Sequence, residues 1–300
     1  MLRLRRQHSQ RIVITDFFFQ TMSTIRNFDE LLAFLKERGE RKRVVVISPR
    51  DESTKAAVAK AVEAGFATCI PVDDDDPDMA AAKGVELVRQ GEADVLMKGL
   101  VNTDNLLRAV LNKQTGILPQ GRVLTHLTCA QLPSYDKFIF CSDVAVIPHP
   151  TAEQREEQLK YLLTLMRSFG ISTPRVGLIN CTEKVNEKHF PFTVEYKQLI
   201  AKAETGAFGP CIVDGPLDLK TCFSPAALHK KGIQSPLEGQ SDAIIFPDIQ
   251  AGNVFYKTIT CFCEAQTAAM LCGPQVPVVL PSRGDSPENK FLSLALASLV

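Results

Sequence analysis

The sequence predicts an α/β fold in which strands and helices alternate along the chain. Two observations carry this prediction. Short runs rich in β-branched residues, at 43–48 and 68–72, are typical of buried parallel strands. Between them, residues 53–62 place apolar side chains at helical spacing, and Gly65 follows as a stop signal. A strand–helix–strand succession of this kind indicates a doubly wound layer of parallel strands covered by helices.

The same alternation continues to the C-terminal end. Short apolar runs predict further strands at residues 93–99, 122–126, 137–142, 175–179, 211–216, 243–247 and 276–280. Apolar residues at helical spacing predict helices at residues 28–35, 81–91, 103–111, 151–169, 192–205, from about 253, and 290–297. The chain has no internal repeat of solenoid length, so a repeat architecture is excluded.

The composition is that of an ordinary globular protein. Of 300 residues, 45% are hydrophobic, and 34 Lys+Arg balance 34 Asp+Glu. This length suits two ordinary domains or one large one. Zero net charge gives no sign of a nucleic-acid or anionic-membrane partner. Since no apolar run approaches the roughly 18 residues of a membrane span, we expect no membrane association and a cytoplasmic protein.

Residues 1–22 differ from the rest of the chain. They are basic and poor in acidic residues, and the regular pattern begins only at about Asn27. The segment lacks the small-residue cleavage site of a secretory signal, while its composition weakly resembles an organelle transit peptide. We favour a dispensable extension, with Met22 as the functional start.

No metal site is expected. The nine cysteines are widely spaced and form no C-x-x-C pair, which favours reduced structural thiols over metal binding. Four adjacent aspartates at 73–76 cannot all face one ion, so a solvated loop is favoured there. The five histidines are scattered without ligand spacing. The glycine-rich signatures G-x-x-x-x-G-K-[ST] and G-x-G-x-x-G are absent.

Candidate ligand-binding residues follow the strands, because ligands of open α/β sheets bind beyond the carboxyl ends of strands. The turn 282–286 combines Ser282, Arg283 and a glycine just before the last helix, a set suited to hold an anion. The planar guanidinium of arginine can bind two phosphate oxygens. The alternative is a helix cap at Asp285 or Ser286, with Arg283 as a surface charge.

Two other turns are candidates. In residues 246–253, Gly252 permits a close backbone approach, and Asn253 can cap a helix while bonding a ligand. The third turn is Asp214-Gly215-Pro216, which an ordinary Asp-Gly turn explains equally well.

Together these segments resemble the phosphate acetyl/butyryltransferase family, and most closely its phosphate butyryltransferase branch. The resemblance extends from about residue 28 to residue 299. It rests on residues 94–99, 102–108, 142–148, 214–216, 246–253 and 281–286, which occur in the family's order.

The resemblance implies two α/β/α domains with a cleft between them, as in isocitrate and isopropylmalate dehydrogenases. Residues 23–140 with 272–300 would form the first α/β domain, and residues 141–271 the second. The cleft would hold coenzyme A and the acyl phosphate, with coenzyme A as a substrate and no tightly bound cofactor. Relatives in this family are usually homodimers or larger homo-oligomers.

The implied reaction is acyl-CoA + phosphate ⇌ acyl phosphate + CoA, with butyryl-CoA as the expected substrate. In the reverse direction the CoA thiolate attacks the acyl phosphate, and the charge on phosphate and oxyanion must be neutralised. Arg283 matches the family's active-site arginine, and Ser282 matches the serine beside it. Substrate contacts are implied for Lys98, Asn102, Arg108, Asp214, Asn253 and Lys257. A solvated helix charge is the alternative for Arg108.

One position departs from the family's pattern. The acetyltransferase branch has a general-base aspartate seven residues after the serine, where this chain has Asn289. An amide cannot take the thiol proton, so Asp285 is the nearest carboxylate for that role, with Glu288 as another. The departure leaves two alternatives open: a CoA- or acyl-phosphate-binding protein without catalysis, or a decarboxylating dehydrogenase of the same fold.

Overall fold

The computed structural model describes residues 24–282 and 284–300. Within them, ten strands form one mixed sheet in the order β2-β1-β3-β10-β9-β4-β5-β8-β6-β7. The strands are β1 (Lys42–Ile47), β2 (Ala67–Val72), β3 (Val95–Lys98), β4 (Thr125–Gln131), β5 (Ile139–Ser142), β6 (Arg175–Ile179), β7 (Ile212–Leu217), β8 (Ala243–Ile245), β9 (Gln266–Cys272) and β10 (Val278–Val279).

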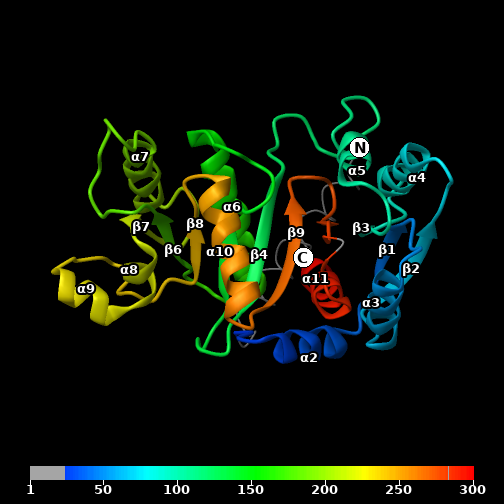
Figure 1. Ribbon diagram of the computed structural model, residues 1–300, viewed down its shortest axis with the longest axis horizontal. Helices are drawn as coiled ribbons and strands as arrows, with labels where there is room; N and C mark the ends of the chain where they lie inside the picture. Colours follow the sequence, from blue (N-terminus) through cyan, green and yellow to red (C-terminus); the bar gives the residue numbers. More distant parts are fainter. Residues whose placement is uncertain (1–23, 283) are drawn as a thin grey trace, which may run out of the picture.

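Ten helices accompany the sheet in this part of the chain. They are α2 (Phe28–Arg38), α3 (Glu52–Glu63), α4 (Pro77–Arg89), α5 (Thr103–Val110), α6 (Ala152–Ser168), α7 (Phe192–Glu204), α8 (Leu219–Phe223), α9 (Pro225–Lys231), α10 (Ile249–Phe262) and α11 (Pro287–Leu299). Figure 1 shows the elements β1–β3 with α3–α5 at one end of the molecule, and β6 and β7 with α7–α9 at the other.

The predicted strand–helix alternation is confirmed at both ends of the sheet. At one end β1 pairs in parallel with β2 and β3, and β3 with β10. At the other end β5, β8, β6 and β7 pair in parallel. The side chains of Val44, Val45, Val46 and Ile47 are all buried, as expected for a strand covered by helices on both faces.

The centre of the sheet is antiparallel, a feature that the predicted strand–helix alternation does not include. There β9 pairs antiparallel with β4 along seven residues, and both strands also pair antiparallel with their outer neighbours β10 and β5. The strand β9 was missed from the sequence because Gln266–Cys272 is rich in alanine and lacks β-branched runs. Tertiary packing overrides that weak local preference, since Ala268 and Leu271 are fully buried.

The last helix, α11, runs through the interior of the protein. Every residue from Lys290 to Leu299 is buried, and the helix packs against β9, α3 and α2. Its one buried cation is paired, because Lys290 Nζ donates to Asp51 Oδ1 at 3.1 Å. A helix buried on all sides fixes the position of the turn that precedes it.

The structure tests two local expectations, the start of α10 and the nature of the acidic run at residues 73–76. The helix expected from about Asn253 begins at Ile249 instead, because Asp248 accepts a hydrogen bond from Ala251 N and caps it. Asp73 and Asp74 pair with Arg50 and Lys83, so this acidic run is a surface loop with cationic partners.

Other expectations concern cysteines, membranes and the N-terminal segment. All nine cysteines are free thiols. No helix in residues 24–282 and 284–300 has both the length and the apolar character of a membrane span. The same ranges contain no cluster of three or more His, Cys, Asp or Glu side chains fit to hold a metal. The proposed extension, residues 1–22, lies outside the described residues.

Candidate active site

A pocket of about 130 Å³ lies where β4, β9, α10 and the turn before α11 meet. It is lined by His126, Val144, Ala145, Asn253, Tyr256, Lys257, Thr267, Ala269, Leu280, Pro281, Ser282, Asp285, Asn289 and Ser293. Four residues predicted from the sequence therefore share one cavity: Ser282, Asp285, Asn253 and Lys257. Asn289, the departure from the family's pattern, lies in it as well.

The turn before α11 is held by hydrogen bonds between its own residues. Ser282 N donates to Asp285 Oδ2 at 2.7 Å, and Asp285 N donates to Ser282 O at 3.1 Å. The helix cap is Ser286, whose Oγ accepts from Asn289 N at 3.1 Å. Asp285 is therefore not the cap, and its carboxylate remains at the pocket wall. Arg283 lies outside the described residues.

The second wall of the pocket belongs to α10. Asn253 Nδ2 donates to Val144 O at 3.1 Å and ties the helix to the loop after β5. Gly252 makes this approach possible, because a Cβ there would lie 2.2 Å from Asp143 O. One turn further along, Tyr256 and Lys257 line the cavity. Burial raises the pKa of Tyr256, and Asp285 adds to the shift while a hydrogen bond with Thr267 opposes it.

A buried carboxylate, Asp143, organises the base of the site. Its oxygens accept hydrogen bonds from Thr125 Oγ1 at 2.8 Å and from His126 N at 3.1 Å. They also accept from the backbone amides of Ala145, Val146 and Ile147. Asp143 thereby joins β4 to the loop that contacts α10.

His126 is a pocket residue that the sequence interpretation did not single out. It lies on β4, is buried, and its Nδ1 is 3.3 Å from Thr128 Oγ1. Burial lowers the pKa of His126, while the negative charges of Asp143 and Asp285 act in the opposite direction. The one sequence signal was a polar alternation, His126 then Thr128, within an otherwise apolar strand.

The other predicted substrate-binding residues do not line this pocket. Lys98, at the end of β3, donates from Nζ to Pro281 O at 3.4 Å and so contacts the backbone next to Ser282. Asn102 occupies the N-cap position of α5 without capping it. Arg108 is exposed on α5 and pairs with Asp78 at 2.8 Å in a separate groove of about 440 Å³. Asp214, on the edge strand β7, accepts from Ser235 Oγ at 2.6 Å.

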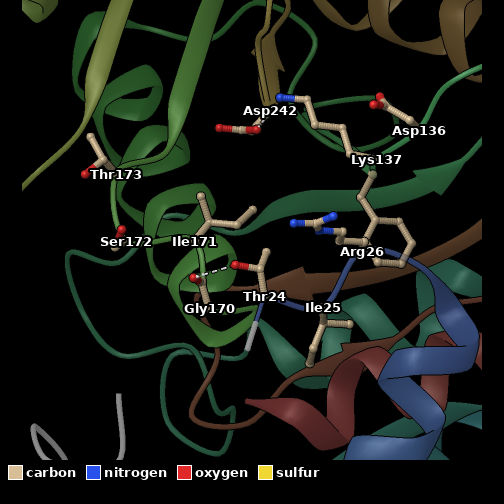
Figure 2. Close-up of a pocket in the computed structure, with 11 residues that line it drawn as sticks. Thr24, Ile25, Arg26, Asp136, Lys137, Gly170, Ile171, Ser172, Thr173 and Asp242 are labelled. Atoms are coloured by element: carbon tan, nitrogen blue, oxygen red, sulfur yellow. Dashed lines mark hydrogen bonds and ion pairs between the residues drawn. The ribbon is translucent and has the colours of Figure 1, made fainter. Parts of the chain in front are cut away.

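A larger hollow, of about 460 Å³, lies elsewhere, between residues 24–26, 136–138 and 170–173. Figure 2 shows its lining, with Thr24 Oγ1 donating to Gly170 O. Its lysine, Lys137, is already paired with Asp242 at 2.6 Å. None of the predicted site residues lines this hollow, so we assign the candidate active site to the smaller pocket.

Comparison with known proteins identifies the family. Residues 76–298 match the family described as Phosphate acetyl/butaryl transferase. The chain belongs to this family. The phosphate butyryltransferase of Clostridium acetobutylicum is 36% identical over 299 residues, covering 92% of this chain and 98% of the relative. The phosphate acetyltransferase of Thermotoga maritima is 37% identical over 223 residues, 74% of this chain and 75% of the relative.

Solved structures agree with the family assignment. A branched-chain phosphotransacylase from Enterococcus faecalis V583 has a TM-score of 0.78 at 28% identity, covering 86% of this chain and 98% of the other. A Salmonella typhimurium structure named for 4-hydroxythreonine-4-phosphate dehydrogenase has a TM-score of 0.50 at 12% identity. It covers 87% of this chain and 100% of its own, and at this identity it shows similarity of fold alone.

Proposed function

We propose that this protein is an acyltransferase that exchanges an acyl group between coenzyme A and phosphate: butyryl-CoA + phosphate ⇌ butyryl phosphate + CoA. The observation that carries the proposal is the pocket in which Ser282, Asp285, Asn253 and Lys257 meet. These residues come from segments that follow two different strands, β8 and β10, as expected of a ligand site at strand ends. Acyl exchange is the activity for which the family and its relatives are named.

The residues present suit the charges of this reaction. The Ser282 hydroxyl and the Lys257 ammonium provide hydrogen-bond donors for phosphate oxygens and for the oxyanion of the tetrahedral intermediate. Arg283 completes this set as the two-pronged phosphate ligand expected from the sequence. Coenzyme A enters as a substrate, and we propose no tightly bound cofactor.

The pocket's position supports a two-domain organisation of the kind found in isocitrate and isopropylmalate dehydrogenases. In our proposal, residues 23–140 and 272–300 form the first domain and residues 141–271 the second. Supporting this division, β1–β3 lie at one end of the sheet and β6–β8 at the other, while at the centre β9 of the second domain lies between β10 and β4 of the first. The pocket draws its lining from both sides, as a substrate cleft between domains would.

Coenzyme A is longer than the pocket, so it needs further contacts. We propose that Arg108 and its groove on α5 hold a distal, negatively charged part of the molecule. The side chain is 64% exposed and its partner Asp78 is 54% exposed, so a phosphate can compete for the guanidinium. We retain Lys98 and Asn102 as proposed substrate-binding residues, and a homodimer or larger assembly as the expected state.

One alternative has an observation in its favour. Asn289 occupies the pocket where a related enzyme would present a carboxylate, which is what a binding protein without catalysis would show. Phosphate-dependent release of free thiol from butyryl-CoA distinguishes the two functions. We expect turnover that requires both phosphate and the acyl-CoA, and binding without turnover would support the alternative.

A matched pair of serine variants locates the activity. Ser282→Ala removes a donor to the developing charge and should lower the rate roughly 10²–10³-fold. Ser172→Ala alters an exposed serine of the larger hollow and should leave the rate unchanged. Equal rates for both variants would remove Ser282 from the site. A loss confined to Ser172→Ala would move the site to the larger hollow.

A further inference from the structure

We propose that His126 is the catalytic general base that compensates for the amide at position 289. The inference rests on the proposed acyl transfer and adds to it the group that moves the proton. It starts from a coincidence of position: His126 and Asn289 line the same pocket of about 130 Å³, one from β4 and one from α11. The imidazole thus lines the cavity in which position 289 has an amide in place of a carboxylate.

The surroundings of the ring favour one orientation and one tautomer. Residues two apart in a strand share a face, so His126 and Thr128 lie side by side, with Nδ1 3.3 Å from Thr128 Oγ1. The Thr128 hydroxyl also interacts with the thiol of Cys141, its neighbour on β5. We infer that the Thr128 hydroxyl donates to that thiol and that the protonated Nδ1 of His126 donates to Thr128 Oγ1. In this neutral tautomer Nε2 carries no hydrogen and has a lone pair. Nε2 forms no hydrogen bond with residues 24–282 or 284–300 and is available to a ligand in the pocket.

The other carboxylates near the pocket already have partners. Asp285 Oδ2 accepts from Ser282 N at 2.7 Å, a bond that shapes the turn. Asp143 accepts five hydrogen bonds at the base of the site. Glu288 pairs with Lys60 at 2.5 Å and does not line the pocket. His126 is therefore the residue best placed to accept a proton.

The other titratable side chains that line the pocket, Tyr256 and Lys257, act as donors. Lys257 offers an ammonium group, which has no lone pair to accept a proton. Tyr256 has its pKa raised, chiefly by burial, so its phenol stays protonated at neutral pH. From β9, only the uncharged Thr267 and Ala269 reach the pocket.

The proton balance of the step is simple. In the direction of acyl phosphate synthesis, His126 Nε2 takes the hydroxyl proton of HPO₄²⁻ as the phosphate oxygen attacks the thioester carbon. The carbon–sulfur bond then breaks, and its electron pair leaves with the CoA thiolate. The imidazolium gives its proton to that thiolate, which yields CoA–SH and returns His126 to the neutral form. The reverse reaction uses the same groups, with the thiol proton passing to Nε2 before the carbon–oxygen bond to phosphate breaks.

The electrostatic surroundings suit both halves of this cycle. Burial lowers the pKa of His126, which keeps the ring neutral and basic at neutral pH. The negative charges of Asp143 and Asp285 oppose that shift and stabilise the imidazolium when it forms. Because the neutral ring is the active form, the rate should fall as the pH drops through a value below about 6.5, the ordinary histidine pKa.

The test compares variants of the full chain in the direction from butyryl phosphate and CoA, because in the other direction the phosphate nucleophile itself titrates near neutral pH. His126→Gln should lower kcat roughly 10²–10⁴-fold, the usual effect of removing a general base, and should abolish the acidic limb of the rate profile. His229→Gln, a change at an exposed histidine on α9, should leave both unchanged. Asp285→Asn keeps an acceptor for Ser282 N and should cost about tenfold or less, well below the loss for a base.

A second variant distinguishes lost catalysis from lost folding. Adding Asn289→Asp to His126→Gln restores the carboxylate of the acetyltransferase branch. The double variant should be at least about tenfold faster than His126→Gln alone. If His126→Gln does not fold, the wild-type profile between about pH 5 and about pH 9 decides, since a flat acidic side contradicts the proposal.

The outcomes separate this inference from the function it rests on. A wild-type chain with no acyl exchange refutes the proposed function. A wild-type chain that is active, with His126→Gln within about threefold of it, overturns only the role of His126. If kcat falls roughly 10²-fold or more in Asp285→Asn and changes little in His126→Gln, the general base is Asp285.

Discussion

At the residue scale, the turn before α11 places the side chains of Ser282 and Asp285 at the pocket, and backbone amides of the turn are hydrogen-bonded within it. The Asp285 carboxylate accepts a hydrogen bond from Ser282 N, and the Ser286 hydroxyl accepts one from Asn289 N. A turn held in this way loses little further freedom when a ligand binds. The Ser282 hydroxyl is then a preorganised donor, and such donors account for a large part of the rate enhancement in acyl transfer.

Arg283 is the residue on which we expect phosphate recognition to depend most. Arg283→Lys keeps the positive charge but loses the planar, two-pronged contact to phosphate oxygens. We predict a fall in kcat/KM of roughly 10²–10³-fold, measured at varied phosphate concentration. Arg122→Lys, a conservative change at a residue whose guanidinium lies 5.0 Å from the Tyr161 ring, serves as a control for general effects of the substitution. Near-native phosphate kinetics in Arg283→Lys would exclude Arg283 from the site.

The sequence identified part of the site because part of it is local. Ser282 and Asp285 lie in one turn, and Asn253 and Lys257 lie one helical turn apart on α10, so short segments reveal them. His126 belongs to the site only through the register of β4 against β9, which places it opposite Leu271. That register depends on long-range pairing, and neighbouring residues do not encode it.

At the scale of the elements, α10 reaches the site through one close backbone contact. Its Gly252 lies against Asp143, and an added Cβ would approach Asp143 O to 2.2 Å and Phe246 Cδ2 to 2.9 Å. Backbone oxygen cannot move aside without disturbing the five hydrogen bonds that Asp143 accepts. The helix would have to shift instead, and Asn253 and Lys257 would shift with it.

Gly252→Ala should therefore destabilise the protein by about 1–3 kcal/mol, the usual cost of overpacking. It should also lower kcat/KM, because the displaced helix carries pocket residues. Thermal unfolding and steady-state kinetics measure the two effects. Thr258→Ala, on the exposed face of the same helix, should change neither by much. Unchanged stability in Gly252→Ala would show that α10 does not pack as closely as described.

Element boundaries followed from local signals where those signals were strong. The predicted helix at residues 151–169 is confirmed as α6, whose capping box joins Thr151 and Gln154 through reciprocal hydrogen bonds. The start of α10 was misplaced because Asp248 was not recognised as its cap. The strand β9 was missed because its alanine-rich segment becomes a strand only between β4 and β10.

At the scale of the whole molecule, Ile25 and Phe28 pack into the core ahead of the first strand. Ile25 N donates to Phe169 O at 2.9 Å, and its side chain is buried. The Phe28 ring meets Phe138 edge-on, with centroids 4.9 Å apart. Residues 25–28 therefore pack against the start of β5 and the end of α6.

This packing sets a boundary for N-terminal truncation. A chain that begins at Met22 should fold and retain full activity, because it keeps every core contact described. A chain that begins at Asp29 loses Ile25 and Phe28 and should be destabilised by roughly 3–5 kcal/mol or more, the cost of removing one large core side chain. Urea unfolding of the two chains measures the difference. An insoluble or inactive chain beginning at Met22 would contradict the dispensability of residues 1–21.

The central claim is that the pocket between β4, β9, α10 and α11 exchanges an acyl group between coenzyme A and phosphate. The most direct measurement follows the phosphorus NMR spectrum and the free thiol together, as the purified full chain acts on butyryl-CoA in phosphate buffer. We predict that butyryl phosphate and CoA thiol appear in equal amounts, and that adding CoA to isolated butyryl phosphate reverses the reaction. Thiol release without butyryl phosphate would indicate hydrolysis and contradict the account, as would the absence of both products.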